Sequence, residues 1–172
     1  MDITRNQRWK RSSIALLQIE PFMMHTVVEL GRIDSDLFVK DIGFRKLRTT
    51  LEGSSDEWVQ LTESITLAYL WVLGTYEVIR TIDQRYKELG LSAERERSLK
   101  LKQIFERLRI PLAKLEPAKR HKETDFSFAY PALNESHGIA WKVSDTTVIS
   151  RGELSSAFLE FLESLRSEVC ET

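Results

Sequence analysis

The chain has 172 residues, of which 42% are hydrophobic and 30% charged, and its formal net charge at neutral pH is -1. A chain of this length and apolar content can bury one substantial core, which excludes an intrinsically disordered protein and favours a single domain over residues 1–172. The single cysteine, Cys170, excludes an internal disulfide and a cysteine-rich metal site, and it favours a reducing, cytoplasmic location.

The N-terminal stretch RWKRSSIALLQIE, residues 8–20, is ambiguous between helix and strand, and we favour a helix because the following segments are helical. The first residues, MDITRNQRWKRSS, lack the apolar run that a secretory signal needs, so export is not expected. The basic sequence RNQRWKR in the same region predicts a small positive strip in which Trp9 is available to stack on a nucleic-acid base.

Two helices are predicted next from their proline and glycine residues. Pro21 suits the first turn of a short helix that Gly31 closes. A second helix is expected from near Ser35 to Gly53, although Gly43 interrupts its weaker periodicity.

The stretch ESITLAYLWVLGTYE, residues 63–77, is the most apolar part of the chain. Its 13 uncharged residues would span about 20 Å as a helix, which is short of the roughly 30 Å of a bilayer core and excludes a membrane span. Apolar residues continue on both sides at alternating spacings of three and four, as in a heptad pattern. The pattern comprises Trp58, Leu61, Ile65, Ala68, Val72, Thr75, Ile79, Ile82, Tyr86 and Leu89.

These residues predict a long helix over about 55–89 that forms the centre of a helical bundle. Its other faces are also apolar near the middle, so we expect neighbouring helices to enclose it on all sides. Ser54 or Ser55 is suited to cap its start, and Gly90 is suited to a left-handed residue at its end.

After Gly90, Ser92 is expected to cap a helix whose apolar stripe runs from Leu101 to Leu115. Pro111 should kink or divide this helix, because proline removes a helical hydrogen bond. A long loop is expected over about 117–138.

The alternating sequence GIAWKVSDTTVIS predicts a small β-hairpin near residues 139–150. Ser150 and Glu153 form the capping-box pattern of a C-terminal helix at 151–168. The sequence therefore predicts a mainly α fold, a single-domain bundle of five to six helices with one small hairpin.

A search for chemical motifs predicts no catalytic residue, no metal site and no cofactor. The three histidines have no partner at helical metal-ligand spacing apart from the ordinary pair of His25 and Glu29, and no glycine-rich phosphate loop or nucleophile elbow occurs. An enzyme is accordingly disfavoured. One candidate polar pocket remains on the central helix, formed by Tyr76, Glu77, Arg80 and Asp83, for which an interhelical set of salt bridges is the favoured alternative.

The charge is distributed unevenly along the second half of the chain. Residues 93–122 hold ten Lys and Arg against four acidic residues, whereas residues 123–172 hold three against nine. The basic segment predicts either binding to RNA or another polyanion, or pairing with the acidic C-terminal helix through residues such as Glu153, Glu160 and Glu163. The candidates for polyanion binding are Lys114, Lys119, Arg120, His121 and Lys122.

Three functional hypotheses follow from the sequence. The leading one is a non-enzymatic module for protein interaction or oligomerisation, with a homodimer or another protein as partner, because the heptad pattern is longer than one small bundle easily buries. An enzyme or small-ligand binder that uses the pocket near Arg80 is the first alternative. A weak binder of RNA or another polyanion is the second, and the sequence pI of about 6.3 disfavours it. No membrane association is expected.

Overall fold

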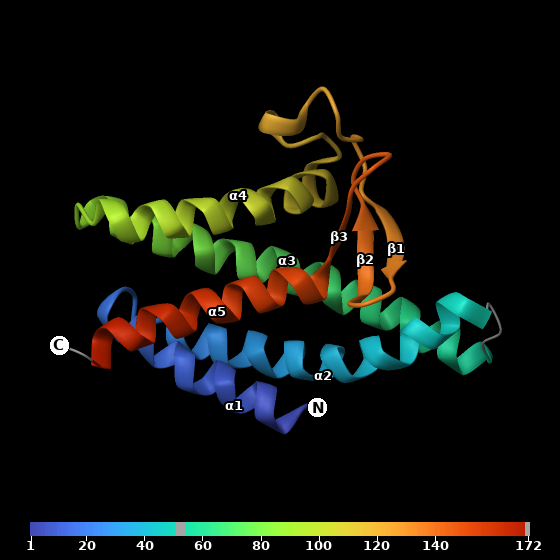
Figure 1. Ribbon diagram of the computed structural model, residues 1–172, viewed down its shortest axis with the longest axis horizontal. Helices are drawn as coiled ribbons and strands as arrows, with labels where there is room; N and C mark the ends of the chain where they lie inside the picture. The colour runs from blue at the N-terminus through green and yellow to red at the C-terminus, as the bar shows by residue number, and fades with distance from the viewer. Residues whose placement is uncertain (51–53, 171–172) are drawn as a thin grey trace.

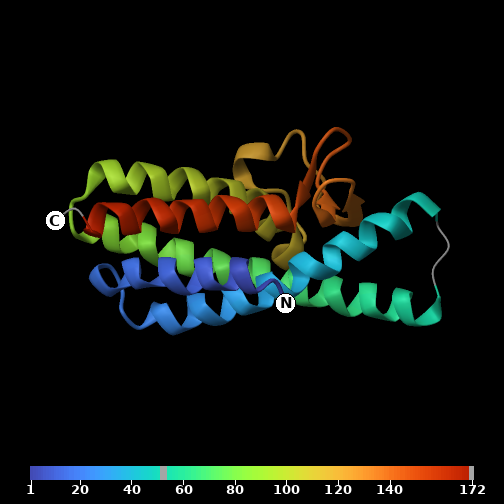
Figure 2. The ribbon, with the colours of Figure 1, turned by 60° about the horizontal axis from the view of Figure 1, so that its bottom comes forward.

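The computed structural model describes the backbone of residues 1–50 and 54–170 and the side chains of residues 1–44 and 54–166. Long helices run side by side, and a small sheet and its loops stand at one end of α4 and α5 (Figures 1 and 2). The elements in chain order are α1 (Ile3–Ser12), the 3-10 helix η1 (Ser13–Gln18), α2 (Met23–Thr50), α3 (Ser55–Glu88), α4 (Ser92–Lys114), the 3-10 helix η2 (Lys119–His121), β1 (Tyr130–Asn134), β2 (Gly138–Lys142), β3 (Val148–Ser150) and α5 (Arg151–Cys170).

The predicted fold class is confirmed, because the protein is 73% helical and carries one small antiparallel sheet. The expected hairpin is present as β2 and β3, with Trp141 opposite Ile149. The N-terminal stretch that was ambiguous in the sequence is helical, as α1 and η1. Four large aromatic rings meet edge to face or tilted at the centre of the core, from α1, α3, α4 and α5: Trp9, Trp71, Phe105 and Phe158.

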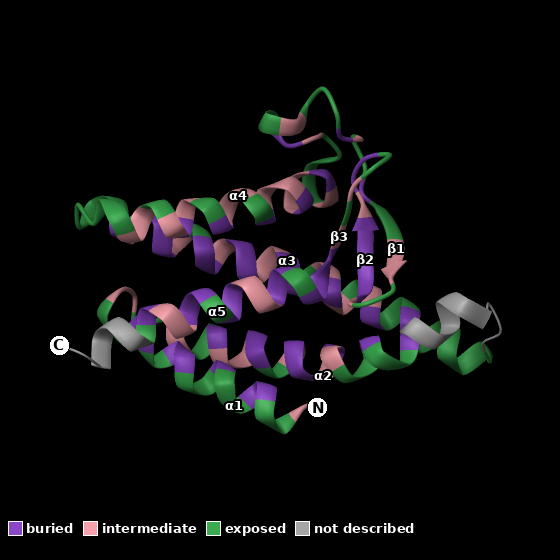
Figure 3. Cartoon of the chain, in the orientation of Figure 1, coloured by how far each residue is buried: buried purple, intermediate pink, exposed green. Residues whose placement is uncertain are grey.

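The central helix α3 begins and ends close to where the sequence predicts. Ser54 and Glu57 form a reciprocal capping box at its start, and Gly90 follows its end with a φ of 72°, a conformation that costs glycine least. Its heptad positions are buried from Leu61 to Tyr86, apart from the half-buried Ile65 (Figure 3). The expectation of enclosure on every side was wrong, because Leu70 in the most apolar stretch is 55% exposed.

The predicted boundaries of the helices between Pro21 and Gly53 were wrong. This region is one helix, α2, from Met23 to Thr50, so Gly31 and Gly43 lie inside it. Gly31 does not end a helix. A glycine is required there because a Cβ would overlap the side chain of Trp9, which packs against α2 at this position. The predicted end at Gly53 lies outside the described residues.

The helix α4 is continuous, although Pro111 was expected to kink or divide it. It runs to Lys114, with Pro111 buried inside it, and ends at Leu115 in the left-handed conformation with a φ of 56°. Ser92 is the first residue of the helix and not its cap, because Leu91 occupies the cap position without a side-chain hydrogen bond.

The predicted loop at 117–138 contains regular structure that the sequence analysis missed. Its residues form η2 and a third strand, β1, which pairs antiparallel to β2 at one edge of the sheet. Pro131 lies within β1, and β1 tolerates it because proline is accepted in a strand at the edge of a sheet. The helix predicted at 151–168 is α5, and both halves of its capping box form, between Ser150 and Glu153.

Candidate functional site

A groove lies between α4 and η2, where two adjoining hollows of about 560 and 320 Å³ share three lining residues. We call this feature the basic groove. Its larger part reaches the sheet at Ile149, and its smaller part reaches the C-terminal half of α4 at Ile110. The groove is lined by Lys100, Gln103, Ile104, Glu106, Arg107, Ile110, Ala118, Lys119, Arg120, His121 and Ile149.

The sequence positions the two walls of the groove differently. Lys100, Gln103 and Arg107 follow one another at spacings of three and four on α4, so they share one face of that helix. The opposite wall is η2, whose start is anchored by the buried Ala118 and whose end is fixed by a backbone hydrogen bond of 2.9 Å from Asp125 N–H to the His121 carbonyl.

Arg107 ties the two walls together. Its Nε and Nη2 donate to the two carboxylate oxygens of Asp125 at 2.8 and 2.9 Å, and Nη2 also lies 3.2 Å from the hydroxyl of Thr147. Burial alone would raise the pKa of Asp125, but hydrogen bonds from Arg107 and Thr124 outweigh it and hold the pKa below its ordinary value. Asp125 therefore stays ionised and keeps Arg107 in place.

The structure brings most of the predicted polyanion-binding residues to this groove. Lys119, Arg120 and His121 line it, and Lys122 follows them in the chain as an exposed residue. Lys114 does not line it and lies 3.8 Å from Glu116. On the α4 wall, Lys100 belongs to the basic segment that the sequence pointed to, whereas Gln103 and Arg107 were not singled out although their spacing was visible in the sequence.

The basic groove contains cations without an acidic partner. In the described part of the chain, Lys119, Arg120 and Lys122 form no ion pair with any acidic side chain. Other basic residues of the segment have partners: Lys102 and Arg95 lie 3.2 and 3.5 Å from Asp83. Within the basic segment, the cations without an acidic partner are thus concentrated on η2 and the residue after it.

Two described acidic residues of the C-terminal helix have partners outside this basic segment. Glu163 accepts two hydrogen bonds from Arg8, at 2.8 and 2.9 Å, and Glu153 accepts from Ser150 at the start of α5. The N-terminal strip also differs from the prediction, because Trp9 is completely buried and donates its indole N–H to Asp34 at 2.7 Å. Trp9 is therefore not available to stack on a base.

The residues of the polar pocket predicted on α3 engage separate partners. Arg80 donates to Glu77 at 2.7 Å, and each side chain is 45% exposed. Asp83 is buried against the basic residues of α4. Tyr76 donates its hydroxyl to Glu106 at 3.0 Å, and burial together with this hydrogen bond raises the pKa of Tyr76 to about 12.

A buried charge network, which the sequence analysis did not find, joins α1, α2 and α5. Asp34 accepts hydrogen bonds from Arg5, Arg151, Trp9 and Ser155. Burial alone would raise the pKa of Asp34, but the charges of Arg151 and Arg5 and these hydrogen bonds outweigh it and lower the pKa.

Asp41, two turns further along α2, is the second carboxylate of this network. It accepts from Arg151 at 2.6 Å and from the backbone N–H of Ile139 at 2.9 Å, so it also attaches β2 to α2. Burial raises the pKa of Asp41 because these fewer partners do not offset the loss of water. Asp34 and Arg151 are completely buried, and the contacts of the network connect α1, α2 and α5.

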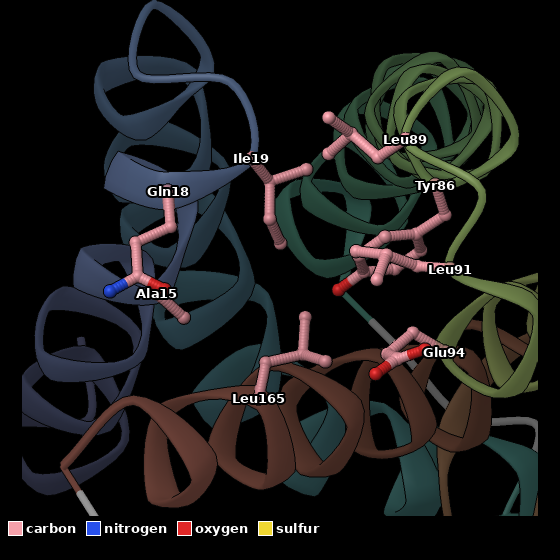
Figure 4. Close-up of a pocket in the computed structure, with 8 residues that line it drawn as sticks. All are labelled: Ala15, Gln18, Ile19, Tyr86, Leu89, Leu91, Glu94 and Leu165. Carbon is pink, nitrogen blue, oxygen red and sulfur yellow. The ribbon is translucent and has the colours of Figure 1, made fainter. Parts of the chain in front are cut away.

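A smaller cavity of about 170 Å³ lies where η1, the turn between α3 and α4, and α5 meet (Figure 4). Leu165 and Ile19 point into it from opposite sides, and Gln18 and Glu94 supply polar groups. Its remaining lining residues are Ala15, Tyr86, Leu89 and Leu91.

In the part of the chain that the structure describes, no three His, Cys, Asp or Glu side chains gather as a metal site would require. No helix there combines the length and apolar character that crossing a bilayer demands. Comparison with protein-family models, curated proteins and solved structures finds no match for this chain.

Proposed function

We propose that this protein binds phosphate-bearing polyanions in the basic groove. The observation that carries the proposal is the grouping of three cations without an acidic partner in the described part of the chain, Lys119, Arg120 and Lys122, at one wall of the groove and directly after it. Arg107 is largely withdrawn from solvent and is paired with the buried Asp125, as charges inside a protein are. Unpaired cations beside a groove instead retain their full attraction for an external anion.

The groove suits a chain of phosphates better than a single ion. Arg120 contributes a cation without an acidic partner from η2, and Lys100, which lies 2.8 Å from Glu96, contributes a paired one from α4, so basic side chains line both walls. Gln103 adds an amide that is able to donate a hydrogen bond, and Ile104 supplies apolar surface beside it. Association would be driven by release of counterions from the polyanion.

The test is fluorescence anisotropy with a labelled DNA duplex of about 20 base pairs, in which the base faces are stacked on each other and the phosphates are exposed. If Lys100, Lys119, Arg120 and Lys122 neutralise four phosphates, affinity should fall by about two decades between roughly 50 and 200 mM salt. Replacing the three unpaired residues by alanine should flatten that salt dependence by about one unit per lost contact.

The matched control removes the same charge from exposed positions outside the groove. Lys10, Lys40 and Lys87 are exposed on α1, α2 and α3, and their alanine variant should retain the affinity and salt dependence of the wild type. Equal losses in both variants, or no binding at the lowest salt concentration, would refute the proposal.

A second candidate function is self-association into a homodimer through the outer part of α2 and α3. These two helices extend beyond the bundle as an arm (Figure 2). A shallow hollow of about 340 Å³ on α3 is lined by Trp58 and Val59, which are 42% and 54% exposed. On α2, Val39 and Ile42 are 44% and 48% exposed. Exposed apolar surface of this kind favours a docking role.

Light scattering after size exclusion tests this second function. A dimer that Trp58→Glu with Val59→Glu converts to a monomer would support it. Phe22→Glu is the control, because Phe22 is 91% exposed at a different place in the fold. A monomer at tens of micromolar that does not change on dilution would rule out self-association.

A further inference from the structure

Three aromatic side chains gather on the surface next to the basic groove: Phe126, Phe128 and Tyr130. We call them the aromatic cluster. The ring of Tyr130 meets those of Phe126 and Phe128 edge to face, with centroid distances of 5.7 and 5.2 Å. Tyr130 is 54% exposed and Phe128 is 42% exposed. Both rings therefore offer a face to solvent while their neighbours hold them in position.

Strand pairing places the cluster on the outer face of the sheet. Tyr130 in β1 lies opposite Lys142 in β2. The residue of β2 that precedes Lys142 is Trp141, which is almost completely buried. Because side chains alternate along a strand, Tyr130 and Lys142 point away from the bundle while Trp141 points into it. The ammonium group of Lys142 lies 5.8 Å from the ring centroid of Phe126 and 3.6 Å from Asp145, so the cation beside the rings is a paired one.

The aromatic cluster is joined to the groove through the chain that leaves Asp125. Phe126 directly follows Asp125, which holds Arg107 of the groove wall at 2.8 Å. The backbone N–H of Phe126 donates to the carbonyl of Val143 at 2.8 Å, which fixes this segment to the sheet. The chain from η2 to the start of β1 stays at the same end of the molecule in both views (Figures 1 and 2).

Cations without partners and exposed, oriented rings together match one ligand chemistry. Phosphates alone need no aromatic surface, and the bases of a duplex are already stacked on each other. A single strand presents both phosphates and free base faces, and aromatic side chains are the usual platforms for such bases. We infer, resting on the function proposed above, that the polyanion is single-stranded nucleic acid whose bases stack on Phe128 and Tyr130.

The experiment compares two labelled strands of equal length by anisotropy, one of oligothymidine and one abasic strand with the same sugars and phosphates but no bases. The wild type should bind the base-bearing strand at least about fivefold more tightly for each stacked base. The variant Phe128→Ala with Tyr130→Ala should bind both strands with the affinity that the wild type has for the abasic one. Its salt dependence should be unchanged, because no charge has been removed.

The conservative variant Phe128→Tyr with Tyr130→Phe keeps both rings and should bind as the wild type does, which separates stacking from any effect on folding. Equal affinity of the wild type for the two strands would overturn the inference, and so would undiminished binding of the base-bearing strand by the alanine variant. In either case, salt-dependent binding of the duplex would leave the function proposed above intact. Failure of the duplex and both strands to bind would refute that function as well.

Discussion

The guanidinium of Arg151, at the start of α5, lies against the carboxylate of Asp34 in α2, and both side chains are completely buried. Arg151 also contacts Asp41 at 2.6 Å, and Arg5 contacts Asp34 at 2.5 Å. Two cations and two carboxylates therefore balance inside the protein. This neutrality is what permits burial, because an unpaired charge in the interior costs several kcal/mol.

Replacing Arg151 by methionine should lower the free energy of unfolding by about 3 to 5 kcal/mol, since two buried carboxylates would be left with one cation. Urea denaturation at neutral pH measures this loss. Arg80→Met is the matched control, because the exposed pair of Arg80 with Glu77 should contribute at most about 1 kcal/mol. Similar losses in the two variants would show that burial of the network has no energetic consequence.

The raised pKa of Asp41 predicts a stability that falls as pH rises. The folded protein holds the proton of Asp41 more tightly than the unfolded chain, so this group stabilises the fold most below its ordinary pKa of 3.8. That contribution is lost as pH rises through the raised pKa. The unfolding free energy of the wild type minus that of Asp41→Asn should therefore decrease from acid to neutral pH in urea titrations.

The lowered pKa of Asp34 predicts the opposite trend for the same type of substitution. Its carboxylate contributes stability above the ordinary pKa of 3.8, and this contribution disappears as pH falls through the lowered folded value. The difference between the wild type and Asp34→Asn should increase as pH rises through the acid range. Parallel curves for the Asp34 and Asp41 variants would contradict the different environments of the two carboxylates.

Two glycines of α2 should respond in opposite ways to alanine. Gly31→Ala places a Cβ against the buried side chain of Trp9 and should destabilise by about 1 to 3 kcal/mol through overpacking. A Cβ at Gly43 meets nothing within 4 Å, so Gly43→Ala should stabilise the helix by roughly 0.5 to 1 kcal/mol. Thermal unfolding followed by circular dichroism measures both, and stabilisation by both would contradict the role of Gly31.

Asp125→Asn should strengthen polyanion binding in the basic groove. The change removes one negative charge and releases the guanidinium of Arg107, which Asp125 otherwise holds at 2.8 and 2.9 Å. If Arg107 then reaches a phosphate, the salt dependence measured with the duplex should steepen by about one unit. Weaker binding by a folded Asp125→Asn variant would contradict this prediction. It would mean that Arg107 contributes to polyanion binding only while Asp125 holds its guanidinium in place.

Local signals in the sequence were sufficient for the helices that carry their own caps. Ser54 with Glu57 and Ser150 with Glu153 mark the starts of α3 and α5, because the capping partners lie three residues apart and act without tertiary context. Gly31 misled the prediction for the opposite reason. The side chain that requires a glycine there is Trp9, and nothing in the local sequence of α2 shows that contact.

The candidate site was predictable in its basic residues but not in the contact that fixes Arg107. The run from Lys119 to Lys122 stands out as charge in the sequence, whereas Arg107 looks the same as its paired neighbours until Asp125 is located in space. The buried network was hidden for a similar reason, since Arg151 and Asp34 are 117 residues apart. The seven-residue spacing of Asp34 and Asp41 on one helix was its only local signal.

The separation between Asp34 and Arg151 sets an order on folding. A chain made from its N-terminus presents Asp34 and Asp41 long before Arg151 exists, and Arg5 can balance only one of the two. The N-terminal helices cannot exclude water around both carboxylates during that time, because the unbalanced charge would oppose it. Closure of the core therefore waits for α5, whose Arg151 completes the charge balance of α1 and α2.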